Sequence, residues 1–520
     1  MPFDLESPVR RSPRRAMRDP ELLAAASALA AEGHAPEALA KVLAYLFPGE
    51  PIPDLTQEAF QFVQGSSRVH VRIDGDDVVL TVPLVRLPPG DEGIPALRYV
   101  LGKLGAPLQL YQPRLSGDDV RLELREPLAR VHPEKIVDVL AKMPADADES
   151  DEILIVQHGA IALDRVPIDP LSDEELARAD RIWRKHWRFV RALTEEARLR
   201  HSMFFLDALT EWAYHRPLDA LPITGLLRAR LDQAASRFND TMADPVDRED
   251  ALAMHAERFA ALPGSELAAS LGHAVFGVDP VPAGTPATLS MHLGEGPHRE
   301  RVEELLAEGD GLGAALDMIA IYTFLLAEHA WEPETEEALR AALQGASGKE
   351  WTDAARDLLG ETRDLVARLG GALCPWCATP LTSYSCEACG GDRDAASEVV
   401  DHPLVSFVSR VLEQQGLDPI ATRRSAERWA FAREGAQITV AIAGDHLAFS
   451  SPVAKADPST LRRLLAEEHA PLAFDLDGDT VRLALSLHVS DVRHVAFDDL
   501  AGRVTRFLDA AGRFREAFAP

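Results

Sequence analysis

An internal repeat constrains this chain more than any other feature of its sequence. The stretch Val71–Asp76 reappears near the other end of the chain as Val440–Asp445, and the match continues without a gap on both sides. Farther on, Gly117–Leu124 matches Gly478–Leu485. Self-similarity of this length indicates one structural unit that occurs twice. The chain is therefore expected to carry one module near each end and something different between them.

Each copy predicts an α-β-β-β-α-β-β-α module. Val69–Ile73 alternates apolar and polar residues with the period of two of a half-buried strand. Asp74-Gly75-Asp76 then predicts a hairpin turn, because glycine accepts a positive φ. Hairpin-connected strands do not form a doubly wound parallel sheet, so we expect an α+β fold with helices mostly on one face. In the first copy we expect helices at Ala35–Leu46, Ile94–Leu104 and Pro133–Met143, and strands at Ala59–Val63, Val69–Ile73, Val78–Val82, Leu108–Gln112 and Val120–Leu124.

The element order, and the strand that begins with Gly117-Asp118 or Gly478-Asp479 after a central helix, resemble the type III secretion chaperone-like superfamily and its YbjN-like relatives. The resemblance implies a non-catalytic protein-binding module, often dimeric through the central helix and the strand after it. Here the second copy is present in the same chain, at a high effective concentration. We therefore expect an intramolecular pseudo-dimer, with a homodimer of two chains as the alternative. The pairing stripes would be Leu97, Val100, Leu101 and Leu104 against Leu461, Leu464 and Leu465, with Arg98 and Arg462 at the rim.

Composition limits the classes of partner. The net charge of −29 argues against a nucleic-acid backbone as the general partner, since that requires clustered Lys and Arg. No apolar run reaches the ~20 residues that a membrane helix needs, and Leu312–Ala327 is better explained as a buried core helix. The few cysteines suit a reducing compartment, so we expect a cytoplasmic protein.

The stretch between the two copies predicts long helices. Ser172 followed by Glu175 is a capping box, which satisfies the first backbone donors of a helix. The aromatic residues that follow are expected to form helix–helix core. Asp146–Asp151 is interpreted as an acidic linker, with an edge strand at Ile153–Val156. The predicted organisation is a disordered basic leader (1–30), a first module (31–160), an all-α domain (171–370), a zinc ribbon (371–395) and a second module (398–520).

Four cysteines form two C-x-x-C pairs, which are Cys374 with Cys377 and Cys386 with Cys389. Two thiolates separated by a tight turn can face one ion, and two such knuckles complete a tetrahedron. This resembles a short zinc ribbon and predicts one structural Zn²⁺. Two alternatives stay open. Cys-Pro-Trp-Cys resembles the redox pair of glutaredoxins, and two disulfides are also chemically feasible.

No nucleophile elbow, phosphate loop, H-E-x-x-H or dinucleotide fingerprint is present in the sequence. His186, His201 and His215 lie on the aromatic helices, where ordinary core or surface histidines are the expected explanation. The turns Asp74–Asp76 and Asp477–Asp479 lack the remainder of a calcium loop. The sequence therefore favours a non-enzymatic adaptor or chaperone-like protein that binds protein partners. The alternative is an enzyme with its site in the helical middle and regulatory end modules.

Overall fold

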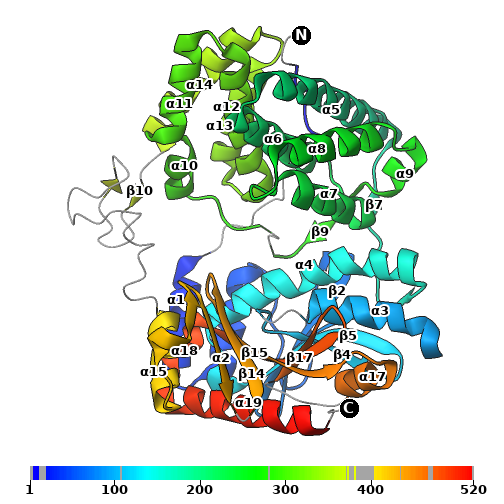
Figure 1. Ribbon diagram of the computed structural model, residues 1–520, viewed down its shortest axis with the longest axis vertical. Coiled ribbons are helices and arrows are strands. Elements are labelled where there is room, and N and C mark those ends of the chain that lie inside the picture. The colour runs from blue at the N-terminus through cyan, green and yellow to red at the C-terminus, as the bar shows by residue number, and fades with distance from the viewer. Residues whose placement is uncertain are drawn as a thin grey trace. The chain divides into compact units, whose positions relative to one another are not determined.

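The computed structural model divides the chain into two compact units. It describes residues 4–10, 19–105, 108–278, 281–369, 372–373, 380–381, 403–433, 435–466 and 472–517. One unit consists of Met1–Arg15, Ile168–Ala274 and Val281–Glu398 and is mainly helical; the other consists of Ala16–Pro167, Val275–Pro280 and Val399–Pro520 and contains both large sheets with helices around them (Figure 1). The predicted combination of sheets near both ends with a helical middle is confirmed.

The first sheet is built from hairpin-connected strands. Its order is β4-β5-β3-β2-β1-β9, and β6 also pairs with β3. All these pairings are antiparallel. Its strands are β1 (Phe60–Gly65), β2 (Ser67–Asp74), β3 (Asp77–Arg86), β4 (Gln112–Ser116), β5 (Asp119–Pro127), β6 (Ile161–Ala162) and β9 (Val275–Phe276). The strand expected at Leu108–Gln112 was placed too early, because the residues that pair with β5 are Gln112–Ser116.

The second sheet repeats the strand order of the first. It runs β12-β13-β14-β15-β17-β16. A register shift between Pro83 and Val85 in β3 recurs between Pro452 and Ala454 in β15. Proline cannot donate to a ladder, which explains why the irregularity follows it in both copies. The strands are β12 (Arg423–Ser425), β13 (Arg428–Arg433), β14 (Ala436–Ala443), β15 (His446–Lys455), β16 (Ala473–Asp477) and β17 (Thr480–His488).

Helix α4 (Pro133–His158) covers the first sheet and α19 (Phe497–Ala517) covers the second. The linker predicted at Asp146–Asp151 and the strand predicted at Ile153–Val156 were wrong, because both stretches lie inside α4. The carboxylates that indicated a linker have partners. Asp146 accepts hydrogen bonds from Gln109 and Tyr111, and Asp151 accepts one from Ser66. Other helices of this unit are α1 (Pro20–Ala31), α2 (Ala35–Leu46), α3 (Ile94–Tyr99), the π-helical turn Val100–Leu104, α15 (Pro403–Gln414), α16 (Pro419–Thr422), α17 (Pro458–Ala466) and α18 (Val489–His494).

The two copies share one hydrophobic core. The π-helical turn of the first copy contacts β16 of the second, and α17 of the second contacts β4 of the first. Two arginines make reciprocal contacts. Arg98 donates to the Gly478 carbonyl at 3.0 Å and pairs with Asp479, while Arg462 donates to Asp118 at 2.9 Å. Because Asp118 and Asp479 occupy equivalent hairpin turns, the contact has the self-complementary pattern of a two-fold interface.

The other unit is helical. Its helices are α5 (Asp173–Arg200), α6 (Met203–Ala220), α7 (Gly225–Phe238), α8 (Pro245–Ala260), α9 (Gly264–Ala269), α10 (Pro286–Leu293), α11 (Pro297–Glu308), α12 (Gly311–Glu328), α13 (Pro333–Ala346) and α14 (Trp351–Leu369). The capping box predicted at Ser172 and Glu175 is confirmed at the start of α5. Trp183 and Trp187 are fully buried against Phe259, as expected for helix–helix core. Helix α12 is long and apolar enough to cross a membrane by length and composition, but 78% of it is buried, as in the core helix of a soluble protein.

The predicted disordered leader was wrong for the described part of residues 1–30. Asp4–Arg10 packs against the helical unit, with Leu5 and Val9 buried. Pro20–Ala31 forms α1, which begins with an Asp19 cap and a proline in the first turn, both favourable helix starts. The arginine content suggested a solvated tail, but the two apolar residues and the alanine-rich stretch have packing partners.

Candidate functional site

The predicted zinc ligands Cys374, Cys377, Cys386 and Cys389 lie outside the described residues. Two short strands flank the first pair in sequence. Ala372 pairs with Leu381 and Leu373 pairs with Pro380, which defines β10 (Ala372–Leu373) and β11 (Pro380–Leu381) as an antiparallel pair. The zinc ribbon therefore stays a prediction.

The three histidines that the sequence placed on the aromatic helices have separate surroundings. His186 lies on α5 between Trp187 and Trp212, and its Nε2 is 3.1 Å from the Ala213 carbonyl. Burial lowers the pKa of His186 to about 3, so its ring is neutral at pH 7. His201 is exposed in the left-handed cap of α5. His215 lies on α6 and is buried. These positions fit the expected core and surface histidines.

In the helical unit, the surface that holds Asp4–Arg10 has the geometry of a binding site. This segment has no helix or strand of its own. The exposed fractions of Leu5 and Val9 are only 8% and 3%, whereas Asp4 and Ser7 are exposed. The segment is thus held by two apolar side chains four residues apart. We call the surface that receives it the segment groove; it is formed by α5, α6, α13 and Ser347.

Backbone hydrogen bonds fix the segment in the groove. The Leu5 amide donates to Ser347 Oγ at 2.8 Å, and the Val9 amide donates to the Ala220 carbonyl at 2.8 Å. Arg216 Nη2 donates to the Glu6 carbonyl at 2.6 Å. These contacts recognise the main chain, which every peptide has. Such contacts give affinity, and side-chain pockets add specificity.

A buried ion network lies beneath the segment. Asp219 is fully buried at the end of α6, where its two carboxylate oxygens accept from Arg216 at 2.7 Å and from Arg340 of α13 at 2.8 Å. Burial lowers the pKa of Arg216 and of Arg10, and Asp219 opposes that shift in both. The network joins α6 to α13 and leaves one guanidinium nitrogen of Arg216 for the peptide carbonyl. The groove floor is therefore a set of paired charges, since Arg340 also pairs with Glu336.

Cavities adjoin the segment. One of about 530 Å³ lies where Asp4 and Glu6 face the cationic side of α5 and includes Phe189 and Trp212. Lys185 pairs with Asp4, and Arg181 Nε lies 3.6 Å from Glu6. A second, of about 330 Å³, lies between Pro8 and α13. The two cavities thus leave room for larger side chains than those of the segment itself.

No family model, curated protein or solved structure matches this chain. The groove must therefore be interpreted from its own geometry. That geometry is an extended peptide held by its main chain, by two apolar anchors and by complementary charges.

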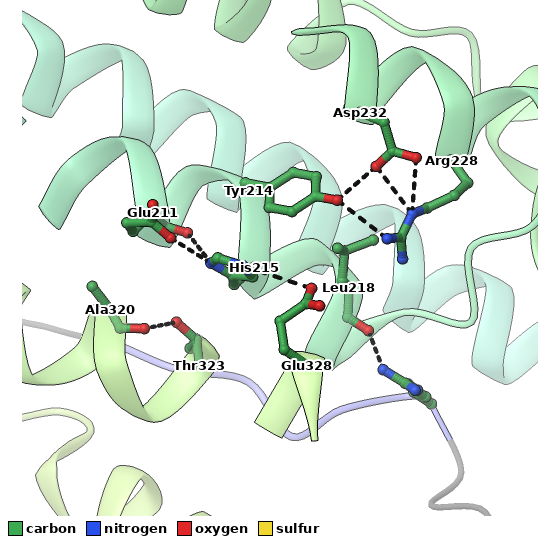
Figure 2. Close-up of polar contacts among 10 residues, drawn as sticks. Glu211, Tyr214, His215, Leu218, Arg228, Asp232, Ala320, Thr323 and Glu328 are labelled. Carbon is green, nitrogen blue, oxygen red and sulfur yellow. Dashed lines mark hydrogen bonds and ion pairs between the residues drawn. The ribbon is translucent and has the colours of Figure 1, made fainter. Parts of the chain in front are cut away.

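Figure 2 shows polar contacts among residues of α6, α7 and α12 next to the groove. Tyr214 donates to Asp232 at 2.6 Å and accepts from Arg228 at 3.1 Å, and burial raises the pKa of Tyr214 strongly. His215 lies between two acids, with Nδ1 3.1 Å from Glu211 and Nε2 3.6 Å from Glu328. His215 is not one of the described residues that line the two cavities. This arrangement supports the end of α6, whose Leu218 carbonyl accepts from Arg10 at 2.8 Å.

The sequence reasoning missed the groove because it treated residues 1–30 as one basic segment. A usable signal was present. Leu5 and Val9 are the only aliphatic residues larger than alanine in residues 4–10, and acidic residues flank Leu5. No signal in the sequence pairs this segment with α6 and α13, because those contacts join residues about 210 to 340 positions apart.

Proposed function

We propose that this chain is a non-enzymatic protein-binding adaptor whose helical unit binds an extended peptide segment. The observation that supports the proposal is the seating of Asp4–Arg10 in the segment groove. A groove that satisfies a peptide main chain and buries two side chains is built for peptide recognition. The partner's segment would resemble the resident one, with an acidic residue on each side of an apolar anchor and a second apolar anchor four residues later.

The end modules supply the other part of the adaptor in this proposal. The reciprocal arginine contacts and the shared core support an intramolecular pair of modules, so that no second chain is needed to complete the pair. The C-x-x-C spacing of Cys374 and Cys377, repeated in Cys386 and Cys389, is the support for a zinc knuckle at that position. We further propose one structural Zn²⁺ on the four cysteines and a cytoplasmic location, both on the basis of cysteine usage.

Peptide binding by the opened groove tests this function. In the full chain, Leu5→Asp together with Val9→Asp removes both anchors of the resident segment and leaves every groove residue unchanged. Burying each of two aliphatic side chains contributes about 1.5–3 kcal/mol, so this variant should release the segment. A fluorescent peptide of residues 2–12 should then bind saturably, as measured by anisotropy. A peptide with the same two substitutions is the matched control. Equal binding of both peptides, or of neither, would refute the proposal.

The enzyme alternative can be tested at His215, which lies between the carboxylates of Glu211 and Glu328. His215→Gln keeps a polar side chain there. If the chain has a hydrolytic or transfer activity in the helical unit, the variant should abolish it. If His215 only supports α6, the variant should change stability and leave peptide binding by the opened groove intact.

A further inference from the structure

A second polar cluster lies where α4 of the first module meets β15 and β17 of the second. His446 and His488 are directly opposite each other in the β15–β17 ladder, with ring centroids 5.3 Å apart. Asp138 of α4 places Oδ2 3.1 Å from Nε2 of His446. One ligand atom from each of these three residues lies within 4.8 Å of the other two. The cluster thus joins a carboxylate of one repeat to two imidazoles of the other.

The two histidines are held rigidly. The exposed fractions of His446 and His488 are 7% and 4%, and both rings stand on paired strands. The Nδ1 atom of His488 lies 2.7 Å from Ser490 Oγ and 3.2 Å from the Ser490 amide nitrogen, and these contacts fix the ring. A metal-binding histidine usually donates its other ring N–H, and Ser490 Oγ is the atom that can accept from Nδ1 of His488.

A cation already contacts two of the three residues. The Lys142 ammonium lies 3.0 Å from Asp138 Oδ1 and 3.1 Å from His446 Nε2. The side chain of Lys142 is 55% exposed, so it can leave the cluster without unfolding anything. Its departure would leave Asp138 and Nε2 of His446 without their ammonium partner. Two imidazoles and one carboxylate suit zinc, and three protein ligands leave a position for water.

We propose that Asp138, His446 and His488 form a zinc site that bridges the two repeats, with the Lys142 ammonium as the resident competitor. The site is separate from the four cysteines and does not depend on the peptide groove. An ion there would tie α4 of the first repeat to β15 and β17 of the second. Zinc would therefore stabilise the pairing of the modules.

Two measurements on the full chain test this site. Native mass spectrometry in added zinc gives the number of bound ions, and thermal unfolding gives the shift caused by zinc. The four cysteines are expected to hold an ion of their own. The number of bound ions in each variant is therefore compared with the number in the other variants. The variants are His446→Gln, His488→Gln and Lys142→Met, and His158→Gln on the same helix is the matched control.

We expect the unmodified chain and His158→Gln to bind one ion more than either cluster-histidine variant, and to unfold at a higher temperature in zinc. Lys142→Met removes the competitor, so it should reach half of the thermal shift at about tenfold less zinc. It also keeps the test valid if a histidine variant fails to fold. Equal stoichiometry in all chains, or a Lys142→Met chain that needs as much zinc as the unmodified one, would overturn the proposal.

Discussion

Lys135 of the first repeat and Asp491 of the second form a buried ion pair, with Nζ 3.1 Å from Oδ1. The exposed fractions of the two residues are 2% and 0%. Lys135 also lies 3.3 Å from Glu126, which accepts from Arg503 at 2.6 Å. Each repeat thus contributes one acid and one base to a balanced network. Breaking a buried pair is costly because the remaining charge stays in a low-dielectric environment.

The first prediction follows from this network. Lys135→Met leaves Asp491 buried without its cation and should lower the free energy of unfolding by about 3–5 kcal/mol. Arg86→Ala breaks an exposed pair with Asp119 in the same unit and should leave the free energy of unfolding nearly unchanged. Urea denaturation measures both. If the two variants cost the same, the buried network does not stabilise the pairing of the repeats.

The second prediction concerns close backbone packing between the repeats. A Cβ on Gly105 would lie 2.5 Å from the Phe474 carbonyl oxygen, and one on Gly102 would lie 3.8 Å from that of Leu476. Gly105→Ala therefore forces β16 away and should destabilise the chain by about 1–3 kcal/mol. Gly102→Ala is the matched control and should be neutral or slightly stabilising. Thermal unfolding compares them, and a harmless Gly105→Ala would contradict the close contact.

The third prediction concerns pH. Burial lowers the pKa of His186 to about 3, and its unfolded value is near 6.5. Between these values the unfolded chain binds more protons than the folded chain, so stability must fall as the pH decreases from about 6.5. One such group contributes a slope of up to about 1.4 kcal/mol per pH unit. His186→Gln should flatten the profile measured by urea denaturation from pH 7 to pH 4. His201→Asn, which alters an exposed histidine, should leave the slope unchanged.

The fourth prediction concerns metal removal. Freshly purified, reduced protein should carry one zinc ion on its four cysteines, and Cys386→Ser should reduce its retention in native mass spectrometry. The ion should persist in His446→Gln, which separates it from the proposed site between the repeats. A chain that carries no zinc before chelation would be inconsistent with a zinc ribbon.

Local patterns in the sequence predicted the elements whose cause is local. The alternation at Val69–Ile73 predicted the strand that the structure shows as β2. Ser172 together with Glu175 predicted the start of α5. The expected helix over 94–104 corresponds to α3 and the π-helical turn after it. In these cases a residue's neighbours along the chain decide its conformation.

The errors came from residues whose partners are distant. The acids of Asp146–Asp151 indicated solvent, but Ser66 and Tyr111 supply hydrogen bonds that allow α4 to continue. Two apolar residues, Leu5 and Val9, were not enough to predict an ordered leader. In the structure their backbone amides donate to Ser347 and Ala220, and these bonds hold the segment in place. Local composition contains no information on such contacts, which is why the groove could not be predicted.

The most direct test of the account compares one labelled peptide, residues 2–12, on two full chains. One chain is unmodified and the other carries Leu5→Asp and Val9→Asp. If Asp4–Arg10 fills the segment groove in its own chain, the peptide must compete with a tethered segment at millimolar effective concentration. The account predicts that the unmodified chain binds the peptide at least about tenfold more weakly than the opened chain. Equal dissociation constants for the two chains would contradict it.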